Sequence, residues 1–189
     1  MRRITLWLLT FILLGVARAG AAQEIEALGG AVFSVDAGPG KPTLNFALGT
    51  IRYGISLTEP RQTGLFAGNT EVLFEAIGGA VVTGPGTVVA AGNILLRRNF
   101  GPSLWMVRPY AQLGGGGAYT DIAQDRTEVL LGSEFNFSAE AAVGVRILLN
   151  SHCSLLLEHN FLHFSNAGAT SRNHGLNSIG AQAGLAFSF

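Results

Sequence analysis

The chain has little charge, a single cysteine and only one long apolar run. Charged residues make up 13% of its 189 residues, and twelve Lys and Arg balance twelve Asp and Glu. No basic surplus is present, which argues against a nucleic-acid partner. Cys153 is the only cysteine, so a disulfide within the chain is excluded. The mean hydropathy is nevertheless +0.37, which is high for a chain without a series of membrane-spanning helices.

The one apolar run lies at the start of the chain, at residues 4–16. Arg2 and Arg3 precede it, and two small-x-small cleavage sites follow it at 17–19 and 19–21. This order of features predicts a secretory signal peptide over residues 1–22 and a mature domain over residues 23–189. Cleavage of this peptide would remove three arginines. The mature chain would then have nine Lys and Arg against twelve Asp and Glu, a net charge of −3.

The mature chain alternates apolar and polar residues with the period of two that is typical of strands. Most of the alternating segments run for about ten residues or more, which suits tilted strands that cross a membrane. We therefore predict an all-β fold, an eight-stranded antiparallel transmembrane β-barrel. The predicted strands are 24–35, 43–56, 65–77, 87–98, 103–115, 134–149, 152–165 and 177–189.

Each predicted strand has one apolar face and one partly charged face. A soluble barrel would bury the apolar face, whereas a membrane barrel turns it towards lipid and encloses the polar groups. The strand ending at Phe189 alternates up to a terminal aromatic residue, which resembles the last strand of bacterial outer-membrane proteins. The predicted lumen pairs four arginines with four glutamates: Arg52, Arg97, Arg108, Arg146, Glu71, Glu75, Glu140 and Glu158.

The spacing between strands also fits an outer-membrane barrel, in which short periplasmic turns alternate with longer external loops. We expect short turns at 57–64, 99–102 and 150–151, and longer loops at 78–86, 116–133 and 166–176. The glycine run 114–117 predicts the start of the third external loop. A change of phase near Gly49 predicts a β-bulge in the second strand.

Polar residues gather on the outer wall where the last two strands meet. Glu158 fixes the lumen-facing positions of the seventh strand, so His163 and Ser165 point outwards. Asn177 shares the outward face of the eighth strand with Phe187. Polar side chains are costly on a lipid-facing wall, which makes these three residues candidates for a function. A His and a Ser two residues apart can act as general base and nucleophile.

Two short motifs frame this corner, His-Phe-Ser-Asn-Ala-Gly at 163–168 and Asn-His-Gly-Leu-Asn at 173–177. Together they resemble the lipid A 3-O-deacylase family, eight-stranded outer-membrane barrels with an active site on the outer wall. The resemblance implies hydrolysis of the acyl chain at position 3 of lipid A, without a metal or another cofactor. It also implies lipid A, or lipopolysaccharide, as the partner and the bacterial outer membrane as the location. The sequence defines no oligomeric state.

The resemblance assigns roles to individual residues of the two motifs. Ser165 would be the nucleophile and His163 its base, while the Gly168 N–H and Asn173 would bind the oxyanion. Asn166 follows the nucleophile, as the family pattern requires.

The chain departs from the family pattern at Asn177, where the family has an acidic residue that orients the His. An amide oxygen accepts a hydrogen bond from imidazole, but it offers no charge to the imidazolium. We therefore expect a serine esterase that acts slowly, or a non-catalytic structural or lipid-binding outer-membrane barrel. An exported soluble β-barrel that binds small apolar ligands is a third hypothesis.

Overall fold

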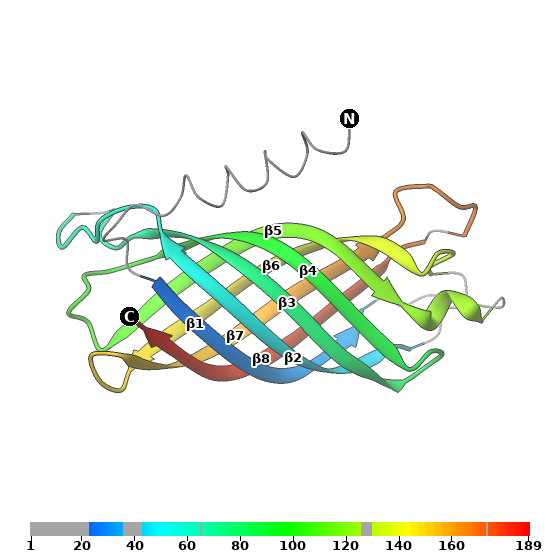
Figure 1. Ribbon diagram of the computed structural model, residues 1–189, viewed down its shortest axis with the longest axis horizontal. Helices are drawn as coiled ribbons and strands as arrows, with labels where there is room; N and C mark the ends of the chain where they lie inside the picture. Colours follow the sequence, from blue (N-terminus) through cyan, green and yellow to red (C-terminus); the bar gives the residue numbers. More distant parts are fainter. Residues whose placement is uncertain (1–22, 36–42, 65, 126–129, 173) are drawn as a thin grey trace, which may run out of the picture.

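The structure, a computed structural model, is a closed antiparallel barrel of eight strands (Figure 1). It describes residues 23–35, 43–64, 66–125, 130–172 and 174–189, so the predicted signal peptide at 1–22 lies outside the described residues. The strands are β1 (Gln23–Ser34), β2 (Asn45–Ser56), β3 (Thr70–Thr83), β4 (Val88–Asn99), β5 (Val107–Thr120), β6 (Phe135–Leu148), β7 (Cys153–Ser165) and β8 (Leu176–Ser188). Each strand pairs with its neighbours in sequence, and β8 closes the barrel onto β1. The predicted fold class is confirmed.

The first and last strands meet at one end of the barrel. The N–H of Gln23 donates to the carbonyl of Phe189, and the N–H of Phe189 donates to the carbonyl of Gln23. We call this the terminal end, and the opposite end, which carries the β3–β4, β5–β6 and β7–β8 connections, the loop end (Figure 1). A short 3₁₀ helix, η1 (Asp121–Gln124), follows β5 at the loop end. Within the described ranges, no helix is long and apolar enough to cross a membrane.

The outer wall of the barrel is apolar and exposed along its whole circumference. Ile51 is 61% exposed, Ile94 59%, Leu113 65% and Phe137 63%, and these four belong to β2, β4, β5 and β6. A water-soluble barrel would not leave so continuous an apolar surface uncovered. The wall is therefore the lipid-facing surface, as the alternation predicts, and it excludes the soluble ligand-binding barrel.

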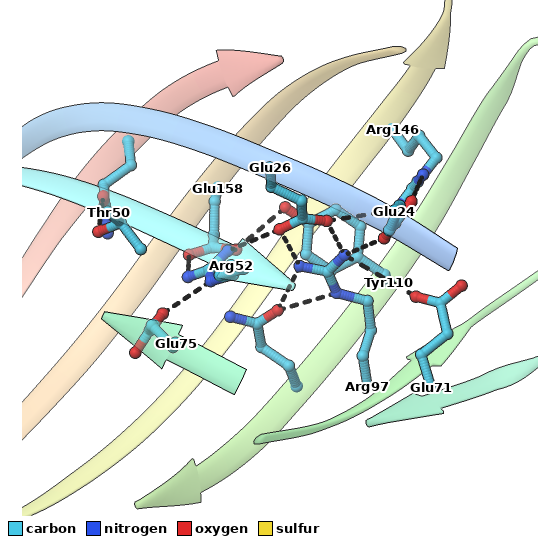
Figure 2. Close-up of polar contacts among 12 residues, drawn as sticks. Glu24, Glu26, Thr50, Arg52, Glu71, Glu75, Arg97, Tyr110, Arg146 and Glu158 are labelled. Atoms are coloured by element: carbon cyan, nitrogen blue, oxygen red, sulfur yellow. Dashed lines mark hydrogen bonds and ion pairs between the residues drawn. The ribbon is translucent and has the colours of Figure 1, made fainter. Parts of the chain in front are cut away.

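The lumen contains a dense network of charged side chains (Figure 2). Arg52, which is fully buried, donates to Glu75 (2.7 Å), to both oxygens of Glu158 (2.9 Å each) and to Glu140 (3.2 Å). Arg97 pairs with Glu26 and lies 4.4 Å above the centre of the Tyr110 ring. Buried ions need such mutual partners, because each would otherwise carry an uncompensated desolvation cost.

The predicted balance of four arginines and four glutamates in the lumen is wrong. Glu24 and Glu26 of β1 are also buried there, and Arg146 donates to both oxygens of Glu24 at 2.5 and 2.6 Å. The inward positions thus carry six glutamates. Arg108, although on the inward face of β5, is only half-buried. Three fully enclosed arginines therefore serve several carboxylates each.

Above the charged network, the loop end of the lumen is filled by apolar side chains. The cluster comprises Val32, Leu44, Phe46, Leu48, Ile77, Val89, Ala118, Ile122, Leu130, Leu131, Leu162, Phe164 and Leu176. Ile122 of η1 and Leu130 and Leu131 of the β5–β6 connection are fully buried in it. The connection thus contributes to the barrel core, and the cluster closes the lumen beneath the β7–β8 connection.

The apolar cluster explains why the bulge predicted at Gly49 is wrong. Gly49 pairs in unbroken register with Gly29 of β1 and Gly78 of β3. Phe46 and Leu48 point inwards into the cluster, and Thr50 and Arg52 follow them on the same face. The apparent change of phase arises because the inward residues of β2 change from apolar to polar between Leu48 and Thr50. The one register irregularity of the β2–β3 pair lies between Asn45 and Phe46.

Glycines inside strands caused two further errors. The run Gly114–Gly117 does not start a loop but lies within β5, paired with β4 and β6. A Cβ on Gly116 would overlap the carbonyl oxygen of Gly92, so glycine permits a close approach of two strands there. Likewise β3 continues through Gly78 to Thr83, which leaves a short turn at 84–87 and a longer connection at 57–69. The predicted alternation of loop lengths fails at these two connections.

Candidate active site

The candidate site lies on the lipid-facing wall, at the loop end of β7 and β8. His163 pairs directly with Asn177 across the two strands, and both are half-buried at outward positions. The His163 Nδ1 lies 2.7 Å from the Asn177 Oδ1. Because the amide oxygen only accepts, the hydrogen bond places a proton on Nδ1, so Nε2 is the nitrogen that accepts in the neutral tautomer. The outward placement predicted for both residues is correct.

Ser165 is the last residue of β7, on the same face as His163 and half-buried. On the neighbouring strand β6, Phe137 pairs with Ser165 and Ala139 pairs with His163. In the described part of the chain no hydrogen bond joins the Ser165 hydroxyl to His163. Two residues along a strand correspond to about 6.6 Å between Cα atoms, a separation that side-chain rotation can bridge. Catalytic hydrogen bonds are often formed only when substrate binds.

The connection after Ser165 begins with a tight turn. The Ala169 N–H donates to the Asn166 carbonyl (3.0 Å), and both central residues have positive φ, 53° at Ala167 and 81° at Gly168. Ala167 is the one non-glycine residue with positive φ among those the structure describes. Such backbone conformations are costly for a residue with a side chain and concentrate at functional sites.

The Asn166 side chain organises this turn. Its Oδ1 accepts from the Gly168 N–H (3.1 Å), while its Nδ2 donates to the Thr170 hydroxyl (2.8 Å) and to the Arg172 carbonyl (3.2 Å). Asn166 is 3% exposed, so its amide is directed into the loop. The Gly168 N–H, which the resemblance assigns to the oxyanion, is engaged by Asn166 in this state. Asn173 lies outside the described residues.

Sequence reasoning did not connect the β5–β6 connection with this site. The Gly175 N–H donates to the Leu130 carbonyl (3.0 Å), and the Arg172 guanidinium donates to the Asp125 carbonyl (3.3 Å). The imidazole of His163 lies beside Gly175, since a Cβ added there would be 3.0 Å from its Cε1. A glycine directly before a strand was the available signal, but the contact joins connections that are distant in sequence.

The residues described do not form a metal centre. Among them, no group of three or more His, Cys, Asp and Glu side chains is arranged to hold a metal ion.

A closed barrel with an apolar outer wall defines an outer-membrane β-barrel, and its candidate site is the polar cluster near the loop end of that wall. The family model described as lipid A 3-O-deacylase (PagL) matches residues 52–186. The chain belongs to this family of outer-membrane hydrolases, and its location is the bacterial outer membrane. No curated protein sequence matches the chain.

Solved structures support the fold independently of the site. The outer-membrane enzyme PagL superposes with a TM-score of 0.58 at 19% identity, covering 85% of this chain and 97% of that one. Neisserial surface protein A gives 0.56 at 14% identity, covering 90% and 98%. The N-terminal β-barrel domain of Pseudomonas aeruginosa OprF gives 0.53 at 14% identity, covering 89% and 97%. At these identities the likeness concerns the barrel.

Proposed function

We propose that the protein is a serine esterase that removes the 3-O-linked acyl chain of lipid A in the outer leaflet. The observation that carries the proposal is the 2.7 Å hydrogen bond from His163 to Asn177, with Ser165 two residues along the same outward face. It orients the imidazole on a lipid-facing wall on the same face as a hydroxyl. Membership of the lipid A 3-O-deacylase family supplies the substrate class.

In the proposed reaction, the Ser165 Oγ attacks the ester carbonyl carbon while His163 Nε2 takes the hydroxyl proton. The tetrahedral oxyanion is bound by the Gly168 N–H, released from Asn166, and by Asn173. Collapse breaks the bond to the 3-oxygen of lipid A, which takes the proton from His163. A water then cleaves the acyl-enzyme with His163 again as base, releasing a fatty acid and free Ser165.

The position of the site matches a substrate that reaches it from within the membrane. His163 and Ser165 lie at the loop end of the exposed apolar wall, where Phe161 precedes them on β7 and Phe137 of β6 pairs with Ser165. An ester near the head-group level of the outer leaflet would meet the hydroxyl there, while its acyl chain stays in apolar surroundings. A passage through the lumen is not needed, because both side chains are on the outer face of the barrel.

The role of Asn177 is the second part of the proposal. Its amide oxygen orients the imidazole, as an acid would, but contributes no negative charge when His163 becomes protonated. We therefore propose a slow esterase. The alternative, a barrel that binds lipid A without cleaving it, predicts the same hydrogen bond but no product.

Mass spectrometry of lipid A from cells that express the protein tests the reaction. Wild type should yield lipid A lacking one 3-linked acyl chain, and Ser165→Ala should abolish that product. Ser151→Ala is a matched control, because Ser151 also contacts a histidine, His152 (2.8 Å), but at the terminal end of the barrel. Unmodified lipid A from folded, well-expressed wild type would refute the esterase and favour the lipid-binding barrel.

A further inference from the structure

Gly175 occupies an unusual place in the connection between β7 and β8. It is buried, its φ is 74°, and its N–H donates to the Leu130 carbonyl at 3.0 Å. Leu130 in turn is fully buried in the apolar cluster at the loop end of the lumen. The backbone of Gly175 is thus tied to the barrel core, whereas its neighbour His174 is exposed.

The space beside Gly175 is occupied by the imidazole of His163. A Cβ at position 175 would lie 3.0 Å from the His163 Cε1 and 3.8 Å from its Nε2. It would also lie 3.6 Å from the Phe164 carbonyl oxygen. Two independent observations therefore favour glycine: the positive φ, and a ring edge so near that a Cβ would displace it by a few tenths of an ångström.

His163 is consequently held on two sides. Asn177 binds the Nδ1 at 2.7 Å, and the bare backbone of Gly175 lies against the Cε1 that joins the two ring nitrogens. A single hydrogen bond at Nδ1 still tolerates small coupled rotations about the two side-chain torsions, which swing Nε2. The second contact limits those rotations and therefore sets where Nε2 points.

We propose that Gly175 is a positioning residue for His163, and that the Leu130 carbonyl holds it in place. The loop between β5 and β6 thereby contributes to placing the base, although none of its described residues is hydrogen-bonded to the Ser165 hydroxyl. The inference rests on the proposed function, since it assumes that His163 Nε2 serves Ser165. A misplacement of about 1 Å costs roughly 100-fold in rate, so a methyl group at position 175 should matter.

The kinetic test compares Gly175→Ala with Gly64→Ala in purified, detergent-solubilised full-length protein. Gly64 also has positive φ, 86°, but a Cβ there meets nothing within 4 Å, so this control carries the backbone strain without the contact. Gly175→Ala should lower kcat by roughly 10- to 100-fold with KM unchanged, and Gly64→Ala should be active as wild type. A folded Gly175→Ala barrel within twofold of the wild-type kcat would overturn the proposal.

A second measurement does not depend on activity. With ¹³C at histidine Cε1, the His163 resonance, assigned by loss in His163→Ala, should move in Gly175→Ala, and those of His152 and His159 should stay. If Gly175→Ala destabilises the barrel, a double-mutant cycle in urea decides: the loss of stability should be smaller in the His163→Ala background, where only the φ strain remains. An unmoved resonance, or equal losses in both backgrounds, would refute the contact.

These readouts separate the two proposals. If wild type releases no acyl chain, the esterase fails, while the resonance and the cycle still decide whether Gly175 sets the ring. If wild type is active and Gly175→Ala is equally active, the esterase stands and the positioning role fails.

Discussion

Restoring a negative charge beside His163 should accelerate the enzyme. In Asn177→Glu, a carboxylate replaces the amide oxygen that lies 2.7 Å from Nδ1. Opposite charges about 4 Å apart attract by about 4 kcal/mol at an effective dielectric of 20. Because both positions are only half-buried, solvent screening reduces the usable part to about 1.5–3 kcal/mol. We therefore expect kcat to rise by roughly 10- to 100-fold.

The matched control is Asn177→Gln, which has the length of glutamate without its charge. The assay is the release of fatty acid from purified lipid A by barrels whose folding is checked from their heat-modifiable migration in gels. Glu should exceed Gln, and Gln should not exceed the wild-type Asn. Equal rates for folded Glu and Gln variants would show that charge at position 177 does not limit the reaction, and would refute this reasoning.

Two further predictions concern the scaffold. Arg52→Met should lower the free energy of unfolding by about 3–5 kcal/mol in urea, because it leaves Glu75 and Glu158 buried without their partner; exposed Arg61→Met should not. For Asp121, slight burial raises the carboxyl pKa, but hydrogen bonds from Thr87 and Val88 outweigh it, and the pKa is lowered from 3.8. Its stabilisation of the 84–87 turn should be complete above pH 3.8 and lost as the pH falls through the lowered pKa. The protection of the Thr87 and Val88 amides against hydrogen exchange should fall in that pH range. Equal protection in wild type and Asp121→Asn at pH 6 would contradict this.

The alternation of side chains was enough to place the candidate site on the correct wall. Glu158 is buried in the lumen. His163 lies five positions further along β7, an odd separation, and therefore points outwards. This inference works because successive side chains in a strand must alternate, so one assigned residue settles the rest. Which residue of β8 faces His163 depends on the register, which the structure shows to be Asn177.

Glycines were the main source of error in the strand boundaries. The sequence alone does not distinguish a glycine that ends a strand from one that lets two strands approach, as Gly116 does towards Gly92. That distinction depends on the curvature of the closed barrel, which brings a neighbouring carbonyl onto the space of a Cβ. The same limitation hid Gly175, whose neighbour His163 belongs to another strand.

The sequence by itself determined the eight-stranded barrel, its apolar outer wall and the outward face of His163, Ser165 and Asn177, because these follow from a local period of two. Only the tertiary structure decided how six lumen glutamates share their arginines, and which loops support the site. Those features depend on contacts between residues far apart in the chain. The carbonyl of Leu130 beside Gly175, and Gly175 beside His163, arise only when the barrel closes and its lumen fills.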